Sequence, residues 1–206
     1  WDDKFTKAGA KAESQLAFYL KRKFAAAPDV LIFNGLRLVD STGDAAQIDH
    51  LIVHRHGFVI IESKSVISKV RINDRGEWSR YFNGYWNGMP SPILQGQRQV
   101  DFLKAVLNAN KEAIRDKVFL LNKVAHFNVA PFEILVAISD SGIVEGRAEG
   151  VYKADQIPDE VERIIKRHKK AAGLLNLSLS LKDGMDKFSD GELERLREFL
   201  LAVHVP

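Results

Sequence analysis

The sequence predicts an α/β domain whose elements follow the order helix, three strands, helix, strand, with further helices at the C-terminal end. Three observations predict this class. Apolar residues recur at steps of three and four from Asp3 to about Phe24, which indicates an amphipathic helix. Residues 47–64 read as two apolar strands around a short turn. Residues 132–139 form a continuous apolar run, typical of a strand covered on both faces.

The composition is that of an ordinary globular domain and limits the chemistry. With 206 residues, 46% of them hydrophobic and 28% charged, the chain can bury a core without disulfide support. It contains no cysteine, which excludes disulfides and thiolate metal sites, so a metal would need oxygen or imidazole ligands. The net charge of +3 is too small to indicate nucleic-acid binding by itself.

Cysteine usage and hydropathy also bear on the cellular setting. The lack of cysteine suits a reducing, cytoplasmic (intracellular) compartment. No apolar run approaches the ~20 residues that cross a bilayer, and no signal-peptide pattern opens the chain, so we expect no membrane association. The first residue is Trp rather than Met, which predicts a piece of a longer protein and leaves fused partner domains and self-association open.

The predicted first helix carries an apolar stripe that a carboxylate joins. Glu13 lies beside the stripe formed by Phe5, Gly9, Ala12, Leu16, Leu20 and Phe24. Burying a carboxylate is costly unless it is paired or bound to a metal, so Glu13 is a candidate site residue. The alternative is a Glu at the helix edge, bonded to a backbone amide or to Lys64. Residues 29–39 then read as a strand, bent or bulged at Asn34-Gly35, before a turn at residues 41–44.

A β-hairpin over residues 47–64 is the most informative part of the sequence. Apolar strands flank the predicted turn at residues 54–57. If Val53 lies opposite Phe58, the pairs that follow on the same face are Leu51 with Ile60, Asp49 with Glu62 and Gln47 with Lys64. His50 points to the opposite face.

Two carboxylates would then stand opposite each other at the end of a core-facing stripe, where like charges repel. A divalent cation such as Mg²⁺ between Asp49 and Glu62 would relieve this repulsion, and Lys64 would reach the same spot. The alternative is a solvated hairpin end with two unrelated acids and a lysine. The pattern is short, and a slip of one residue would separate the acids.

Short strands and a capped helix follow the hairpin. Residues 66–86 alternate loosely, with turn signals at residues 73–76 and at Asn83-Gly84. Ser91-Pro92 predicts the start of a helix that runs to about Asn110, because Ser caps helices and Pro suits the first turn. The side chains that share one face of this helix are Gln95, Gln99, Phe102 and Val106.

The C-terminal part is predicted to be mostly helical. A loop with three glycines separates the strand at residues 132–139 from a short strand at Val151-Tyr152. Residues 158–170 read as a helix with the basic end RIIKRHKK, and Ser189 with Glu192 forms a capping box for a last helix through Val203. Residues 174–181 alternate, but the segment is short and its structure stays open.

Together these motifs resemble one family of nucleases. The residues that carry the resemblance are Gly9 and Glu13 in GAKAE, Gln47-Ile48-Asp49-His50, Gly57 before FVIIESK, Trp86, and Pro92 with Gln95 in SPILQ. Their order and spacing, over roughly residues 9–140, resemble the NERD (nuclease-related domain) family of the PD-(D/E)xK nuclease superfamily. One departure is Ser91, where the family's motif usually has Asn, but Ser caps a helix as well as Asn does.

The resemblance implies a restriction-endonuclease-like αβββαβ core, in which helices flank a mixed central sheet. We expect residues 1–150 to form this core and residues 151–206 to form a helical C-terminal extension packed on the same domain. The resemblance further implies a metal-dependent nuclease that hydrolyses phosphodiester bonds, with DNA as the expected partner and Mg²⁺ or Mn²⁺ as the cofactor.

The expected catalytic residues are Glu13, Asp49, Glu62, Lys64 and Gln95. Asp49, Glu62 and the backbone carbonyl of Ser63 would hold the metal, with Glu13 as a further candidate ligand. Lys64 would hold or deprotonate the attacking water; the metal would lower its pKa and the two carboxylates would raise it, and the balance stays open. Gln95 would orient Lys64 or the water, or be a simple polar helix residue. Gln99, one turn further along, is expected to be only such a residue.

Three further features have both a functional and a structural interpretation. We expect His54 and His56 in the turn to be solvated rather than to bind metal. The aromatic residues between Trp78 and Trp86 could stack on unpaired bases, but covering a small sheet is the preferred interpretation. The basic residues at 163–170 fit phosphate contacts and the helix macrodipole equally well.

Two functions other than cleavage are compatible with these motifs. One is a domain of this fold that binds nucleic acid without cutting it, and the other is a structural or regulatory module of a larger protein. The intact set of Asp49, Glu62 and Lys64 favours the enzyme. A pure binder has little reason to keep two opposed acids that repel phosphate.

Overall fold

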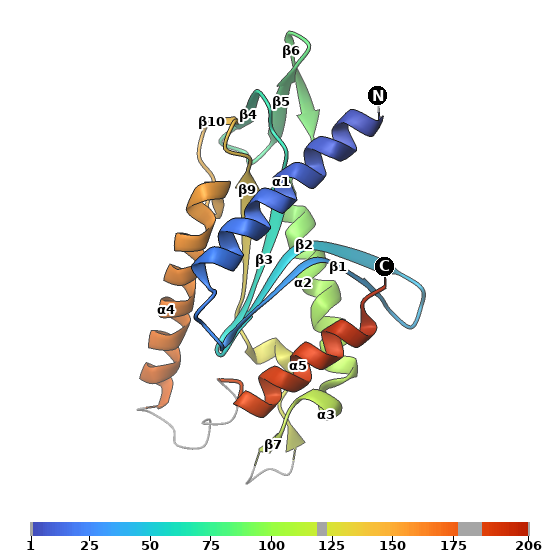
Figure 1. Ribbon diagram of the computed structural model, residues 1–206, viewed down its shortest axis with the longest axis vertical. Coiled ribbons are helices and arrows are strands. Elements are labelled where there is room, and N and C mark those ends of the chain that lie inside the picture. The colour runs from blue at the N-terminus through green and yellow to red at the C-terminus, as the bar shows by residue number, and fades with distance from the viewer. Residues whose placement is uncertain (1, 119–122, 177–186, 206) are drawn as a thin grey trace.

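The computed structural model describes residues 2–118, 123–176 and 187–205. At its centre is a five-stranded sheet in the order β1-β2-β3-β9-β11 (Figure 1). Its strands are β1 (Val30–Val39), β2 (Ala45–His54), β3 (Gly57–Lys64), β9 (Phe132–Ile138) and β11 (Val151–Lys153). β1, β2 and β3 pair in antiparallel fashion, whereas β9 is parallel to β3 and β11 is parallel to β9. The predicted mixed sheet is therefore confirmed.

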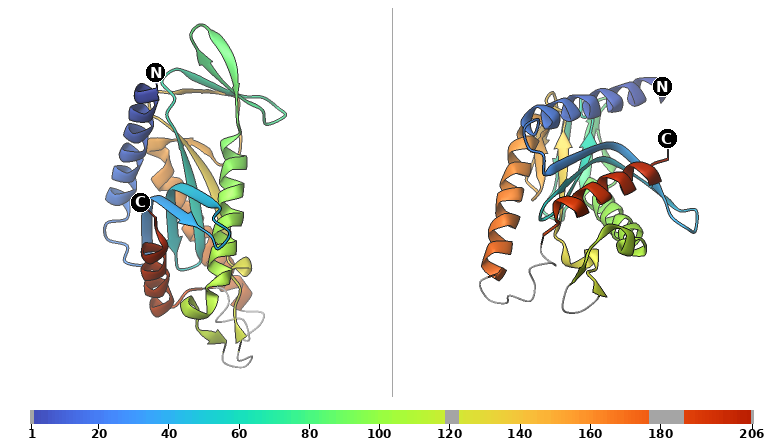
Figure 2. Two further views of the ribbon diagram at one scale, coloured as in Figure 1. Left: turned by 90° about the vertical axis from the view of Figure 1, so that its right-hand side faces the viewer. Right: turned by 60° about the horizontal axis from the view of Figure 1, so that its bottom comes forward.

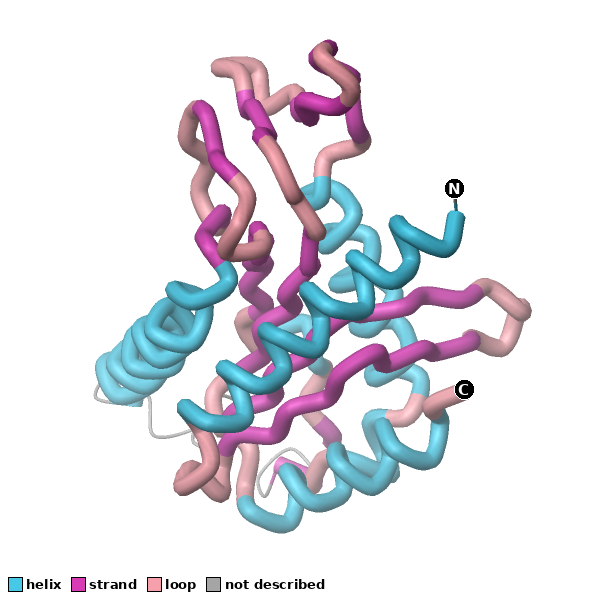
Figure 3. The backbone as a smooth tube through the Cα atoms, turned by 45° about the horizontal axis from the view of Figure 1, so that its top comes forward, coloured by secondary structure: helices cyan, strands magenta, loops and turns pink. Residues whose placement is uncertain are grey.

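Helices cover both faces of the central sheet. The two pairs of helices are α1 (Asp2–Lys23) with α4 (Ile157–Asn176), and α2 (Pro92–Ala109) with α5 (Asp190–Val203). Ile52 and Val59 lie in the core beneath α1 and α4, whereas Leu51 and Phe58 lie in the core beneath α2 and α5. This alternation is what strands covered on both faces require. α1 crosses the strands obliquely, and it lies on the opposite side of the sheet from α2 (Figures 2 and 3).

The hairpin of β2 and β3 has the predicted register over most of its length. The observed pairs include Val53 with Phe58 and Leu51 with Ile60. Pairing ends at His50 and Ile61, so the predicted ladder pairs Asp49–Glu62 and Gln47–Lys64 are wrong. The two strands separate just before these residues, which leaves the polar side chains at an open end of the hairpin. β1 keeps one register with β2 on both sides of Gly35, so the chain bends there (φ 64°) without an inserted residue.

A second, smaller sheet stands at one end of the central sheet (Figure 1). We call it the satellite sheet; its strands, in spatial order, are β10 (Ile143–Glu145), β4 (Lys69–Ile72), β5 (Trp78–Phe82) and β6 (Tyr85–Met89). Asn83 and Gly84 both have positive φ, as the tight turn between β5 and β6 requires. The sequence predicted the short strands and both turns, but not β10, which reaches β4 from a distant segment.

Five short elements complete the fold of the described residues: α3 (Lys111–Ile114), β7 (Lys117–Val118), β8 (Lys123–Val124), and the 3₁₀ turns η1 (Phe127–Val129) and η2 (Ala154–Gln156). α4 runs past the predicted end at residue 170, and residues 174–176 belong to it. The rest of the alternating segment, residues 177–181, lies outside the described residues. Within the described chain, none of the helices has both the length and the hydropathy that a membrane span requires.

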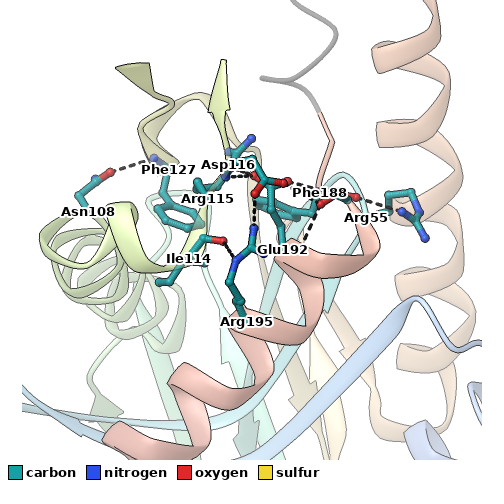
Figure 4. A network of polar contacts seen from close by, with 10 residues as sticks. Arg55, Asn108, Ile114, Arg115, Asp116, Phe127, Phe188, Glu192 and Arg195 are labelled. Atoms are coloured by element: carbon teal, nitrogen blue, oxygen red, sulfur yellow. Dashed lines mark hydrogen bonds and ion pairs between the residues drawn. The ribbon is translucent and has the colours of Figure 1, made fainter. Parts of the chain in front are cut away.

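A buried ion pair ties α5 to the rest of the domain (Figure 4). Arg115 Nε donates to Glu192 Oε1 at 2.9 Å, and both side chains are almost fully buried. The guanidinium of Arg115 also lies 4.9 Å from the ring centroid of Phe188. Arg55, in the turn between β2 and β3, donates to the Phe188 carbonyl and to Asp190 at the start of α5. The predicted capping box of Ser189 and Glu192 is confirmed.

Candidate functional site

Asp49 and Glu62 meet where β2 and β3 separate. Asp49 Oδ2 accepts a hydrogen bond from the Ser63 amide at 2.8 Å, so a side chain takes the place of the next ladder bond. This bond holds Asp49 next to the residue that follows Glu62, close enough for the charge of Glu62 to act on the Asp49 carboxyl, without a direct cross-strand pair. Ser63 is held against Asp49 by its amide.

Glu62 is the buried centre of the site. Its side chain is only 2% exposed, and both of its oxygens have partners. Lys64 Nζ lies 2.6 Å from Glu62 Oε1, and Gln99 Nε2 donates to Glu62 Oε2 at 3.0 Å. Lys64 also donates to Gln95 Oε1 at 3.1 Å, and its side chain is 25% exposed. The ammonium therefore lies between the buried carboxylate and the solvent.

α2 presents both glutamines to residues of β3, and its capped start fixes where the helix begins. Ser91 is the N-cap, with its side chain accepting from the Leu94 amide, and Pro92 follows, as the sequence predicts. The expectation for Gln99 is wrong, since it is 5% exposed and contacts Glu62 directly. Its Nε2 also donates to the Gln47 carbonyl at 2.8 Å, which fixes the amide between β2 and β3. The sequence feature that could have identified Gln99 as a site residue is its position one turn after Gln95 on the same helix face.

Glu13 faces the same cluster from α1. Burial raises the pKa of its carboxyl, the nearby charge of Glu62 raises it further, and Lys64 lowers it. These interactions place Glu13 within electrostatic range of the hairpin end. Of the predicted residues, Glu62, Lys64 and Gln95 are in hydrogen-bond contact, Asp49 bonds to the amide of the residue after Glu62, and Glu13 lies within electrostatic range of Glu62 and Lys64.

The cluster carries more negative than positive charge. Burial raises the pKa of Asp49 to about 7, and the carboxylates of Glu62 and Glu13 add to the shift. The Ser63 amide and Lys64 lower it but do not cancel these effects. A pKa this high means that the folded protein disfavours the ionised form of this carboxyl. Binding of a further cation beside it would therefore be favourable.

The side chains suit a hard divalent cation in chemical type. Among the described residues, no three His, Asp or Glu side chains already converge closely enough to hold a metal. Carboxylate and carbonyl oxygens are nevertheless the donors that Mg²⁺ and Mn²⁺ prefer. The high pKa of Asp49 marks the unbalanced charge that such an ion would offset. The residues present thus fit a divalent cation.

His54, one of the two turn histidines that we expected to be solvated, is covered by other parts of the chain. His54, at the turn end of β2, is buried and stacks on His168 of α4 with ring centroids 5.2 Å apart. Its Nε2 lies 3.3 Å from His168 Nδ1, and His168 Nε2 lies 3.1 Å from Glu133. His50 is buried against Asn34. The expectation of a solvated ring is therefore wrong for His54, because α4 covers the turn.

The structure also bears on the basic residues of α4 and on the aromatic residues between Trp78 and Trp86, whose roles the sequence left open. Three basic side chains of α4 form ion pairs, Arg163 with Glu160, Lys166 with Glu162 and Arg167 with Glu133. These pairs favour a structural role for that part of the helix. Trp78 is buried beneath the satellite sheet, as preferred for the aromatic residues, whereas Tyr85 is 75% exposed.

Comparison with known proteins gives one match. The model of the NERD family, described as a nuclease-related domain, matches residues 8–127. That range contains the residues gathered at the hairpin end and the satellite strands β4, β5 and β6, whereas α4 and α5 lie beyond it. No curated protein and no solved structure matches the chain.

Proposed function

Because the chain belongs to the nuclease-related domain (NERD) family, we propose that it is a metal-dependent nuclease that hydrolyses phosphodiester bonds, with DNA as its substrate. One observation carries this proposal. Lys64 bridges the buried Glu62 and Gln95 beside Asp49, so an ammonium, two carboxylates and an amide oxygen share one spot. Phosphodiester hydrolysis needs positive charge at the phosphate and a group that handles a proton, and this spot offers both.

A divalent cation belongs to the proposal because the acids would otherwise repel phosphate. Asp49, Glu62, the Ser63 carbonyl and Glu13 would hold Mg²⁺ or Mn²⁺, which when bound supplies positive charge at the phosphoryl oxygens and lowers the pKa of water. Gln99 keeps Glu62 directed at this position through its bond to Oε2. Its second bond, to the Gln47 carbonyl, ties that orientation to β2.

Lys64 has the role of contacting the phosphate and the attacking water. Its side chain is far more exposed than that of Glu62, so a phosphate arriving from solvent meets the ammonium first. The ammonium offsets charge that develops in the transition state and holds the water by a hydrogen bond. Gln95 keeps the ammonium directed through the 3.1 Å bond to its Oε1.

A domain that binds nucleic acid without cutting it is the second candidate. The observation in its favour is the 2.6 Å contact of Lys64 with Glu62, because this internal ion pair already neutralises one carboxylate. Such a domain would bind phosphates through the same ammonium but would not hydrolyse them.

A nuclease assay separates the two candidates. The purified chain is incubated with Mg²⁺ or Mn²⁺ and with linear, circular, single-stranded and double-stranded DNA, and with RNA. We expect metal-dependent cleavage of DNA that falls about 10²-fold or more in Lys64→Ala, the scale for losing a positioned electrostatic or proton-transfer group. Lys166→Ala, at an exposed lysine of α4, is the matched control and should cut like the parent. Equal cleavage by parent and Lys64→Ala would refute the proposed role, and a parent inert with every substrate would favour the second candidate.

A further inference from the structure

Three of the four strands of the satellite sheet, β4, β5 and β6, are inserted into the chain between two residues of the site. Lys64 ends β3 and residues 65–68 lead to β4, while Met89 ends β6 and α2 begins at Pro92. Both connections are short, so the position of the sheet is tied to Lys64 and Gln95. Figure 2 shows this sheet projecting from the end of the molecule at which α2 begins.

One face of the satellite sheet packs on the core and the other faces outward. Val70, Ile72 and Trp78 on the inner face are buried together. The residues that alternate with them form what we call the outer face: Lys69 and Arg71 of β4, Ser79 and Tyr81 of β5, and Trp86 and Gly88 of β6. The function proposed above uses none of these residues.

Aromatic rings and a guanidinium lie together on the outer face. Tyr81 pairs with Trp86 across the strands, and their ring centroids are 5.5 Å apart in an edge-on arrangement. The guanidinium carbon of Arg71 lies 4.0 Å from the centroid of the Trp86 ring. Tyr81 is 37% exposed. Aromatic rings and guanidinium planes that reach solvent are the surfaces on which unpaired bases stack.

A trough of about 800 Å³ lies beside Arg71 and extends to the first turn of α2. Arg71, Ser79 and Gly88 of the outer face line it, together with Arg75, Glu77 and, in the first turn of α2, Leu94. The next residue along α2 is Gln95. A Cβ on Gly88 would have nothing within 4 Å, so the floor of the trough is bare backbone next to open space. A volume of this size holds a ligand of the size of a nucleotide.

The charges on the outer face suit a phosphate backbone. Lys69 and Arg71 share one carboxylate, that of Glu145, at 3.3 and 2.8 Å, so one positive charge is left over. Arg75 and Glu77 also line the trough and carry opposite charges, so the excess positive charge is that of the β4 cations. Cations that alternate with stacking rings are the pattern by which proteins bind single strands without sequence preference.

We propose that the outer face and its trough bind unpaired nucleotides of a nucleic-acid strand beside the site, which rests on the proposed nuclease function. Unpaired nucleotides fit because the exposed rings need free base faces, whereas a duplex keeps its bases stacked on one another. Trp86 with Arg71 stacks a base, and the cations hold the flanking phosphates. The satellite sheet then sets which part of a strand reaches Lys64.

Binding is measured with the full chain in EDTA, so that no strand is cut. The probes are fluorescently labelled oligo(dT), oligo(U) and a DNA duplex of equal length. Trp86→Ala should weaken binding of the single strands about tenfold or more, as expected for one lost stack. Phe18→Ala removes an aromatic ring of α1 that is 58% exposed and lies outside the outer face, and this variant should bind like the parent.

Gly88 provides a second test that leaves the rings in place. Because the space above Gly88 is open, both Gly88→Glu and Gly88→Lys should fold, which thermal unfolding checks. The two side chains have similar length and opposite charge. We expect Gly88→Glu to weaken single-strand binding several-fold and Gly88→Lys to keep it, because only the glutamate repels phosphate in the trough.

The results also separate this inference from the nuclease proposal. Folded Trp86→Ala and Gly88→Glu proteins that bind single strands like the parent would overturn the inference, even if the parent cuts DNA. Equal losses for single strands and duplex would overturn it too, because stacking on free base faces would not be the cause. A parent that cuts nothing, but whose single-strand binding is lost in these variants, would leave the inference standing and refute the nuclease.

Discussion

Asp49 provides the sharpest test of the electrostatics of the site. In the metal-free protein, burial and the neighbouring carboxylates raise its pKa from 3.8 to about 7. Below pH 3.8 the carboxyl is protonated in both the folded and unfolded states and has no effect on stability. Between pH 3.8 and 7 only the unfolded state releases the proton, so the contribution of Asp49 to the stability of the parent falls as the pH rises through this window. Above pH 7 the loss is constant.

The magnitude follows from the size of the shift. One pKa unit corresponds to about 1.4 kcal/mol, so a shift of roughly three units corresponds to an upper value of about 4 kcal/mol. Asp49→Asn removes the charge but keeps a side-chain oxygen that can accept from the Ser63 amide. The variant should therefore be more stable than the parent at pH 8 by up to this amount, and the difference should shrink steadily toward pH 4.

Urea unfolding in EDTA, at several pH values from 4 to 8, measures this difference. Asp44→Asn, at an exposed acid between β1 and β2, is the control and should track the parent. A gap between Asp49→Asn and the parent that does not change with pH would refute the reasoning. Adding Mg²⁺ extends the test: the parent should gain stability by mass action and Asp49→Asn should not. An equal response in both proteins would place the cation elsewhere.

Three further predictions concern other parts of the structure. Gln99→Leu leaves the buried Glu62 Oε2 without its donor, so we expect the free energy of unfolding in urea to fall by about 1–3 kcal/mol and cleavage to be reduced. Gln97→Leu, at an exposed glutamine of the same helix, should change neither quantity. Burial lowers the pKa of His54 from 6.5 to about 3, so only the unfolded state takes up a proton at this ring as the pH falls from 6.5. The contribution of His54 to stability therefore drops over that window, and stability at low pH relative to pH 7 should be higher in His54→Phe than in the parent. The same pH dependence of stability in both proteins would contradict this account. Arg115→Met strands the buried carboxylate of Glu192 and should cost about 3–5 kcal/mol in urea unfolding. Arg197→Met, at an exposed ion pair of α5, should cost less than about 1 kcal/mol, and similar losses in the two variants would argue against the buried pair as the anchor of α5.

The sequence by itself determined the helices, strands and turns that are specified by residues close together in the chain. The apolar stripe of α1, the caps of α2 and α5, the turn at Asn83-Gly84 and the pairing of Val53 with Phe58 all follow from spacing and turn chemistry within a few residues. The same periodicity put Asp49, Glu62 and Lys64 at one end of the hairpin. These inferences succeed because side chains alternate along a strand and recur every 3.6 residues along a helix, whatever the rest of the chain does.

Only the tertiary structure decided which of these side chains meet, and how. The ladder ends at His50 and Ile61, so the Asp49 carboxylate bonds to the Ser63 amide, an outcome that depends on how the strands twist apart. Gln99 reaches Glu62 because α2 packs across β3. The distance between these two side chains cannot be predicted from the residues on either side of them in the sequence.

Long-range packing also decided the surroundings of the site. β10 completes the satellite sheet from a segment far along the chain, and α4 buries His54 in a turn that the sequence predicts to be solvated. Both outcomes arise because each element must bury its apolar surface against whatever part of the chain can cover it. That choice is made among distant segments, so it is absent from any short stretch of sequence.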